Sequence, residues 1–353
     1  MKILYPLLAV LALVALGFLG GWVTDLRVVF AIVIPYLAAA IFVVGFVYRV
    51  LRWARSPVPF HIVTTTGQQR SLPWIKSSYL ESPHNTAGVV GRVAMEVLLF
   101  RSLFRNTTTE IRNGRLIYGE EKLLWLAGLA FHWSLLVVLT RHLRFFLEPV
   151  PAFIGVIQTV DGFLQVGVPS LYITTAIIIL ALGYLLLRRL ILPQIHYISL
   201  PADYFALFLI LGIAITGALM RHFFRTDVEG VKELALGLVS FHPVVPRVGV
   251  SPLFFAHLML VSSLAAYFPV SKLMHLGGIF LSPTRNLANN SRMRRHVNPW
   301  NYPVNVHTYA EWQEEFKDKL EAADIPLDEE LKATEAAAVS ADDQNGQRPR
   351  IAI

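Results

Sequence analysis

The sequence predicts an all-α fold, a polytopic membrane bundle of about six transmembrane helices. Of its 353 residues, 55% are hydrophobic and only 16% are charged, whereas soluble proteins carry about 25% charged residues. Six stretches are apolar over most of the roughly 20 residues that a helix needs to cross the hydrocarbon core. The centres of these stretches contain no Asp, Glu, Lys or Arg. The composition therefore excludes a disordered chain and argues against an ordinary soluble enzyme.

The six expected spans follow one another at uneven spacing. In chain order they are residues 3–23, 28–48, 123–140, 163–187, 204–220 and 248–271, the last continuing past Lys272 to Phe280. The first stretch is longer than the apolar region of a signal peptide, about 7–15 residues, so we interpret it as a retained helix. These spans divide the chain into transmembrane helices 1–50, a loop 51–120, a four-helix core 121–281 and a tail 282–353.

Basic residues predict the orientation. Residues 49–122 contain eleven Lys and Arg, and the loop 148–162 contains none. Lys and Arg concentrate in cytoplasmic loops. We therefore expect a protein of the cytoplasmic (inner) membrane that has both termini, the loop 51–120 and the tail on the cytoplasmic side. Four basic residues between the fifth and sixth spans oppose this assignment without reversing it. The basic excess thus indicates topology and contact with lipid, and no nucleic-acid partner is expected.

The two long polar segments are expected to be partly ordered. Residues 92–104 form an amphipathic stretch that suits a membrane surface or a partner. In the tail, residues 313–332 are typical of a helix, with Phe316 and Leu320 on one face. Residues 333–353 are small and polar, which predicts disorder.

Four histidines lie in or beside two of the spans, and ionisable residues inside spans usually serve a function. His132 and His142 are on the third span, and His257 and His275 are on the sixth. Because these two helices run in opposite directions, we expect an outer pair, His142 with His257, and an inner pair, His132 with His275. The spacings of about 15 and 27 Å along straight helices differ, so a bend near Pro269 is required.

We interpret each pair as the two axial ligands of one haem iron. Two imidazoles alone would leave zinc short of ligands, and bis-histidine ligation favours electron transfer over oxygen chemistry. The absence of cysteine excludes c-type attachment and cysteine-bound iron–sulfur clusters in this chain. The alternative is that these histidines are hydrogen-bonded interior residues without a metal.

Several polar residues near the histidines are candidates for supporting roles. Arg141 and Arg144 flank His142 and are expected to pair with haem propionates, unless they only anchor the helix end at the interface. Lys272 is the corresponding candidate at the inner haem. His222 is a candidate quinone ligand near the outer haem, or an ordinary loop histidine. Asp161 and Glu148 are weaker candidates for proton transfer on the outer side.

The histidine spacing resembles a known family. His-x9-His on one helix and His-x17-His on a later one are similar to the dihaem gamma subunits of respiratory nitrate reductases. Residues 282–286 (SPTRN) and 294–301 (RRHVNPWN) resemble the DsrM cytochrome b subunits of the membrane complex associated with dissimilatory sulfite reduction, which belong to the same wider family. The resemblance covers the third to sixth spans and the proximal tail.

The resemblance implies two b haems and a quinone, menaquinone, bound near the outer haem. It also implies a cytoplasmic iron–sulfur partner, a DsrK-like subunit related to the catalytic subunit of heterodisulfide reductase, and the small protein DsrC in trisulfide or thiol form beyond it. Further membrane subunits and a periplasmic cytochrome c would complete such a complex. The tail 282–312, with its Arg cluster and aromatic residues, is expected to dock the cytoplasmic partner.

The expected function is therefore that of a quinone-linked oxidoreductase subunit, which exchanges electrons between the quinone pool and the iron–sulfur partner in sulfite and DsrC-trisulfide metabolism. One alternative is a membrane subunit of a nitrate-reductase-like or heterodisulfide-reductase-like complex. Others are a haem-free anchor and a proton-coupled transporter without haem. The helix centres, which lack charged residues, argue against the transporter.

Overall fold

The computed structural model describes residues 1–57, 67–163, 169, 171–245, 249–282, 286–293, 308–328 and 332. The chain forms two compact units, residues 1–296 and 297–353. The predicted disordered end, 333–353, and the motif 294–301 lie outside the described residues. Residues 286–293, which the sequence assigns to the tail, belong to the first unit.

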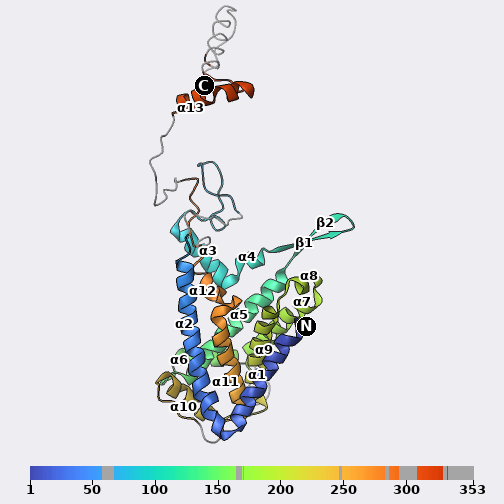
Figure 1. Cartoon of the computed structure of the whole chain (residues 1–353), viewed down its shortest axis with the longest axis vertical. Helices are drawn as coiled ribbons and strands as arrows, with labels where there is room; N and C mark the ends of the chain where they lie inside the picture. The colour runs from blue at the N-terminus through green and yellow to red at the C-terminus, as the bar shows by residue number, and fades with distance from the viewer. Residues whose placement is uncertain are drawn as a thin grey trace, which may run out of the picture. The chain divides into compact units, whose positions relative to one another are not determined.

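Six helices of the first unit are long and apolar enough to cross a membrane, which confirms the predicted fold class (Figure 1). They are α1 (Leu4–Trp22), α2 (Ile34–Ala54) with two short helical turns before it, α5 (Lys122–His142), α7 (Ile173–Ile191), α9 (Pro201–His222) and α11 (Pro252–Tyr267). Shorter helices join them: α6 (Ala152–Asp161), α8 (Pro193–Ile198), α10 (Val228–Val239) and α12 (His275–Gly278).

The helix starts follow local chemistry. Pro193, Pro201 and Pro252 each occupy the first turn of a helix, where a missing N–H removes no hydrogen bond. The fourth span begins at Ile173, about ten residues later than the hydropathy of the sequence predicts.

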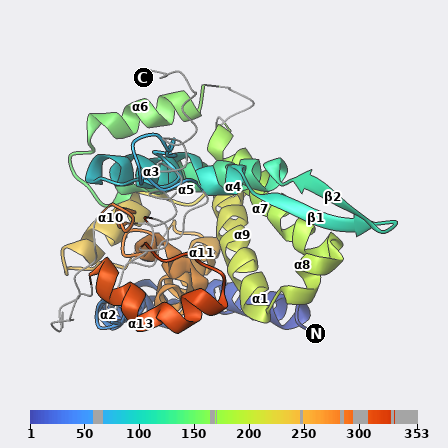
Figure 2. The same ribbon diagram turned by 90° about the horizontal axis from the view of Figure 1, so that it is seen from above.

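Helix α11 occupies the centre of the bundle. It packs against α1, α2 and α9, while α9 also contacts α1 and α7 (Figures 1 and 2). Helix α5 packs mainly on α7 and has no extensive backbone contact with α11 in the described part of the chain. Helices α5 and α11, which carry His132, His142 and His257, are therefore not packed directly on each other.

Helices α1 and α11 approach each other closely. Gly17 and Gly21 are buried on α1 and face Phe255 and Ala256 of α11. A Cβ atom on Gly17 would lie 2.6 Å from the Cα of Ala256. Glycine therefore permits direct contact of the two backbones, as is common where membrane helices pack.

The loop 67–120 forms a cap at one end of the bundle. It contains α3 (Thr86–Leu99), α4 (Arg101–Phe104) and an antiparallel hairpin of β1 (Thr107–Arg112) and β2 (Arg115–Glu120). Asn85 begins α3 by accepting a hydrogen bond from Gly88 N–H (2.9 Å). Phe100 ends it in the left-handed region, at φ 51°. We call this end of the bundle, where α5 begins and α12 lies, the loop end (Figure 1).

The start of the tail packs on this cap. Asn289 is buried, its Nδ2 donates to Ser82 Oγ (2.7 Å), and its backbone N–H donates to Pro83 O (2.6 Å). The two long polar segments of the sequence therefore meet at the loop end. In the second unit, α13 (Tyr309–Ala322) begins four residues earlier than predicted, because Thr308 and Glu311 form a reciprocal cap.

We expect Gly17→Ala to destabilise the bundle, because the added methyl group must push α1 away from α11. Overpacking of this kind costs about 1–3 kcal/mol, so the melting temperature of the purified protein in detergent should fall by several degrees. Gly155→Ala in α6 is the matched control, since a Cβ there would meet no described atom within 4 Å. Equal melting temperatures for the two variants would contradict the close packing.

Candidate functional site

The structure brings the four histidines together in pairs at two levels of the bundle. His132 lies within α5, and His275 begins α12 at the loop end. Their ring centroids are 5.9 Å apart, with the ring planes at 75°. Two imidazoles that share one iron through Nε2–metal bonds of about 2 Å would have centroids roughly 6 Å apart. The observed separation therefore suits a shared metal.

His132 is held by its own helix and by aromatic neighbours. Its Nδ1 lies 2.7 Å from Gly128 O, one turn earlier in α5. The edges of Phe100 and Phe131 meet its ring at centroid distances of 4.9 and 4.8 Å. Phe100 reaches this position from the left-handed turn that ends α3, so the cap and the histidine are in direct contact.

His275 is positioned differently, because the sixth span is not one continuous helix. Helix α11 ends at Tyr267, a 3-10 turn follows over Phe268–Val270, and Ser271 is extended (φ −103°, ψ 176°). A bend near Pro269 was predicted, but a full break occurs two residues later. His275 Nδ1 lies 2.9 Å from Lys272 O within the new turn. The two histidines of this span therefore do not share the face of a single helix.

The second pair lies at the opposite end of the bundle. His142 ends α5, and its Nδ1 lies 2.7 Å from Val138 O. His257, near the start of α11, lies 2.9 Å from the hydroxyl of Thr216 on α9. His142 and His257 thus lie at the same end of the bundle, where α5 ends and α11 begins.

All four side chains share one hydrogen-bonding pattern. A carbonyl only accepts, so His132, His142 and His275 must carry the proton on Nδ1. Thr216 already donates to Gly212 O (2.8 Å), so its oxygen accepts from His257 Nδ1–H. In the described part of the chain no hydrogen bond reaches Nε2 of any of them. Each Nε2 therefore presents a lone pair, as a metal-ligating histidine requires.

This donor set fits haem. The described residues contain no group of three or more His, Asp or Glu that could hold a bare metal ion, and a porphyrin supplies the four equatorial ligands that two imidazoles lack. The absence of close packing between α5 and α11 also suits a flat group held between them. His132 with His275, and His142 with His257, would bind the two irons.

Arg141 is engaged by protein groups. It is buried, and its Nε forms an ion pair with Asp161 Oδ2 at 3.0 Å, without the alignment of a hydrogen bond. Asp161 also accepts from the N–H (2.8 Å) and hydroxyl (2.7 Å) of Thr174. The guanidinium lies over the ring of Tyr172 at 3.7 Å. Arg141 thus joins α5 to α6 and α7, whereas the sequence suggests a haem propionate as its partner.

The remaining candidates differ in their surroundings. Arg144 lies over the ring of Phe145, 4.7 Å from its centroid. Lys272 forms an ion pair with Asp203 of α9 at 2.7 Å. His222 ends α9, and its Nε2 is buried with no hydrogen-bond partner among the described residues. His222 therefore has an unsatisfied polar atom of the kind that a ligand would pair.

Sequence reasoning missed three contributors to these sites. Thr216 orients His257, Phe100 packs on His132, and Tyr172 lies against Arg141 and, at 3.9 Å, also against Arg221. For Thr216 the signal was present, since it is a hydroxyl residue in an otherwise apolar span. Phe100 lies in the expected loop and Tyr172 within the expected fourth span 163–187, and the sequence position of neither residue distinguishes it from other aromatic residues near the spans.

Comparison with known proteins identifies the family of the chain. The family model of the nitrate reductase gamma subunit matches residues 89–296, which include all four histidines. The Hdr-like menaquinol oxidoreductase cytochrome b-like subunit of Archaeoglobus fulgidus is 46% identical over 285 residues, covering 79% of this chain and 85% of that protein. Its namesake in Archaeoglobus profundus is 43% identical over 273 residues, covering 76% and 81%. The chain therefore belongs to the nitrate reductase gamma subunit family and is a multi-pass membrane protein related to cytochrome b-like subunits.

Proposed function

We propose that this chain is the dihaem cytochrome b subunit of a menaquinol-oxidising membrane complex. The observation that carries the proposal is the shared state of the four histidines, each with Nδ1 bound to the chain and Nε2 free. Haem b, when bound, supplies reversible one-electron chemistry. The names of both Archaeoglobus relatives support menaquinol as the electron donor.

The chain's own residues define how such a subunit would work. The two imidazoles at each level would hold a haem iron between them, an arrangement that favours electron transfer over oxygen chemistry. The hydrogen bond to each Nδ1 fixes the tautomer and raises the basicity of Nε2. His132 and His142 are about 15 Å apart along α5, so the two redox centres lie at two depths. This spacing allows electrons to cross the bilayer between a quinol on one side and a partner on the other.

The proposed topology places the loop end in the cytoplasm. The excess of Lys and Arg in residues 49–122 supports this orientation, in which both termini lie on the cytoplasmic side of the membrane. The tail 282–312 would then dock a cytoplasmic iron–sulfur subunit. In α13, the stacked rings of Tyr309 and Trp312 are exposed (5.7 Å between centroids), and exposed aromatic residues are enriched in interfaces.

We further propose that the partner is DsrK-like and that the complex serves sulfite and DsrC-trisulfide metabolism. The support is the similarity of residues 282–286 and 294–301 to DsrM. The names of the relatives are equally compatible with another heterodisulfide-reductase-like complex. Identification of the subunits that co-purify with the chain would decide between the two.

Our second prediction concerns haem content. Pyridine haemochrome analysis should give about two b haems per chain, since two bis-histidine pairs are present. His142→Ala and His257→Ala should remove the same haem, while His132→Ala and His275→Ala should remove the other, as followed by redox difference spectra. His242→Ala is the matched control, because His242 also binds a carbonyl through Nδ1 (Ser240 O, 2.8 Å) but belongs to neither pair. A stoichiometry near one, or a different pairing, would contradict the assignment.

The third prediction concerns docking of the partner. A chain that ends after Met293 retains the contact of Asn289 with Ser82 and should keep both haems. It should lose the iron–sulfur subunit on purification from native membranes, because α13 and the aromatic residues before it are gone. A chain that ends after Lys332 keeps α13 and should retain the partner. Co-purification with both truncated chains would show that the tail does not dock it.

The fourth prediction places the quinone beside His142 and His257. Thr216 binds His257, and His222 lies six residues further along α9, about 9 Å toward its end. A menaquinol analogue should shift the spectrum of the haem that is lost in His142→Ala. His222→Ala or Arg144→Ala should weaken its binding about tenfold, as expected for one lost hydrogen bond. The control His242→Ala should not. A shift confined to the other haem would overturn this placement.

A further inference from the structure

Specific hydrogen bonds hold the break in the sixth span. The Ser271 hydroxyl donates to Phe268 O of the preceding turn (2.9 Å) and accepts from Leu273 N–H of the following one (3.1 Å). The Ser271 side chain thus bonds to both helical ends, and it supplies an acceptor for the N–H of Leu273 in the first turn of the new segment. A new 3-10 turn, Lys272–Met274, then leads into His275.

This break changes what holds the histidine. His132 and His142 bind carbonyls four residues earlier in a continuous helix, so α5 itself sets the direction of their rings. His275 binds the carbonyl of Lys272, three residues earlier, within a single short turn. A turn of this length is not stable alone. Its orientation must therefore come from contacts with the rest of the bundle.

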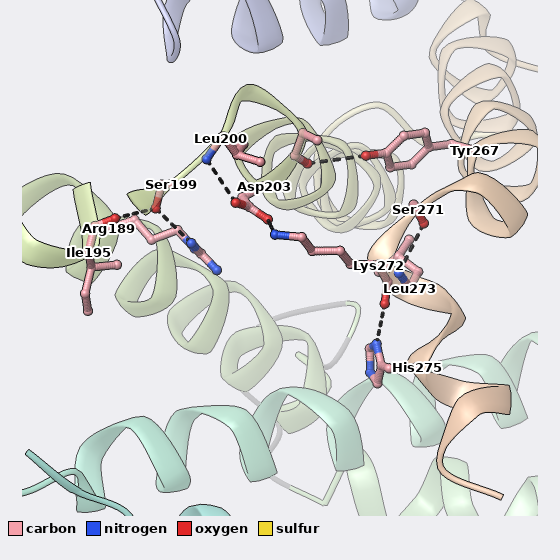
Figure 3. A network of polar contacts seen from close by, with 11 residues as sticks. Arg189, Ile195, Ser199, Leu200, Asp203, Tyr267, Ser271, Lys272, Leu273 and His275 are labelled. Atoms are coloured by element: carbon pink, nitrogen blue, oxygen red, sulfur yellow. Dashed lines mark hydrogen bonds and ion pairs between the residues drawn. The ribbon is translucent and has the colours of Figure 1, made fainter. Parts of the chain in front are cut away.

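Lys272 provides such a contact through its side chain. Its Nζ lies 2.7 Å from Asp203 Oδ1 in the first turn of α9 (Figure 3). The Asp203 side chain is only 7% exposed, and its other oxygen accepts from Leu200 N–H (3.0 Å). A buried carboxylate requires a cation or hydrogen-bond donors to offset its desolvation. The lysine therefore meets a carboxylate that is itself fixed in place.

A second contact ties the same two segments together. Tyr267, the last residue of α11, donates its hydroxyl proton to Ala202 O (3.4 Å), and its ring meets Phe205 at 5.0 Å. Figure 3 shows the Tyr267 hydrogen bond beside the Asp203–Lys272 pair, with His275 directed toward the backbone of Lys272. The start of α9 thus serves as the support for the turn that carries His275.

We propose that the Asp203–Lys272 ion pair is a positioning device for His275. Lys272 contributes twice: its side chain is bound to α9, and its carbonyl oxygen orients the imidazole. The inference rests on the proposed function, in which His275 and His132 share a haem. In this inference the partner of the Lys272 side chain is Asp203 and not a haem propionate. Neither residue is a ligand, and both act through the turn between Ser271 and His275.

This support matters because a metal site tolerates little displacement of its ligands. Ligands must be held within about 0.5 Å and 10–20° of their working geometry. Leu273 and Met274 also pack this turn into the bundle. Without the pair, the Lys272 end of the turn loses its link to α9, so the Lys272 carbonyl can shift and His275 shifts with it. His142 and His257 lie at the opposite end of the bundle, so their site should not respond.

The test compares Lys272→Met with Asp203→Asn in the purified haem-loaded protein. The amide of the asparagine variant retains an oxygen for Leu200 N–H, so the start of α9 is preserved. Both variants should change the electron paramagnetic resonance signal and the midpoint potential of the haem that is lost in His275→Ala. With Lys272→Met, haem content should fall from about two toward about one per chain. The other haem should be unchanged, which shows that the chain is folded.

Two further variants sharpen the comparison. Lys272→Arg keeps the ion pair and should restore the signal. Lys122→Met is the control, because Lys122 also lies at the loop end and faces a carboxylate, Glu120 (3.8 Å), but its other contacts are with Phe104 of α4 and not with the turn that carries His275. It should leave both haems as they are.

The double variant separates positioning from direct contact with haem. If the pair acts as one unit, Lys272→Met with Asp203→Asn should shift the signal no further than Lys272→Met alone. If Lys272 instead binds a propionate, Asp203→Asn should have no effect, and that result overturns the inference. The proposed function itself would be contradicted if the wild-type protein did not bind two haems, or if the His275→Ala variant still bound both. Two haems in wild type together with unaltered pair variants would contradict the positioning role alone.

Discussion

The hydrogen bond at Nδ1 of each histidine is the constraint on which the rest of the site depends. An unpaired N–H inside an apolar bundle is costly, so each imidazole must direct Nδ1–H at an acceptor supplied by the chain. Once that bond is made, Nε2 points away from the supporting backbone. The bundle meets this demand in three ways: with a carbonyl one turn back in α5, with the hydroxyl of Thr216 on a neighbouring helix, and with the carbonyl of Lys272 in a short turn.

Much of the architecture could be predicted because hydropathy alone defines a membrane span. The antiparallel direction of the third and sixth spans predicts which histidines lie at the same depth in the membrane, and it predicts that His132 lies near His275. The break at Ser271 was not foreseen, since it depends on one hydroxyl that bonds to both neighbouring turns. Likewise, spacing cannot show that Arg141 faces Asp161 or that Lys272 faces Asp203. These partners come from other helices and are known only once the bundle is packed.

The charged residues at the span ends do more than set topology. In the described part of the chain, three ion pairs lie near the ends of spans: Arg141 with Asp161 of the short helix α6, Arg188 with Glu121, and Lys272 with Asp203. Ion pairs deep in the interior carry a large desolvation cost, and pairs fully in water contribute little. Arg141 and Asp161 are both buried, whereas Lys272 is exposed and only its partner Asp203 is shielded. The basic residues that orient the chain in the membrane thus also join its helices.

The distribution of the histidines over the chain has a consequence for biogenesis. Each pair takes one member from the third span and the other from the sixth, and 114 residues separate His142 from His257 in the sequence. Neither histidine pair is therefore complete until the sixth span has left the ribosome and entered the membrane. The first five spans insert with only one member of each pair in place. Completion of both sites then becomes a late event, and the α1–α11 glycine contact, which also needs the sixth span, would form at the same stage.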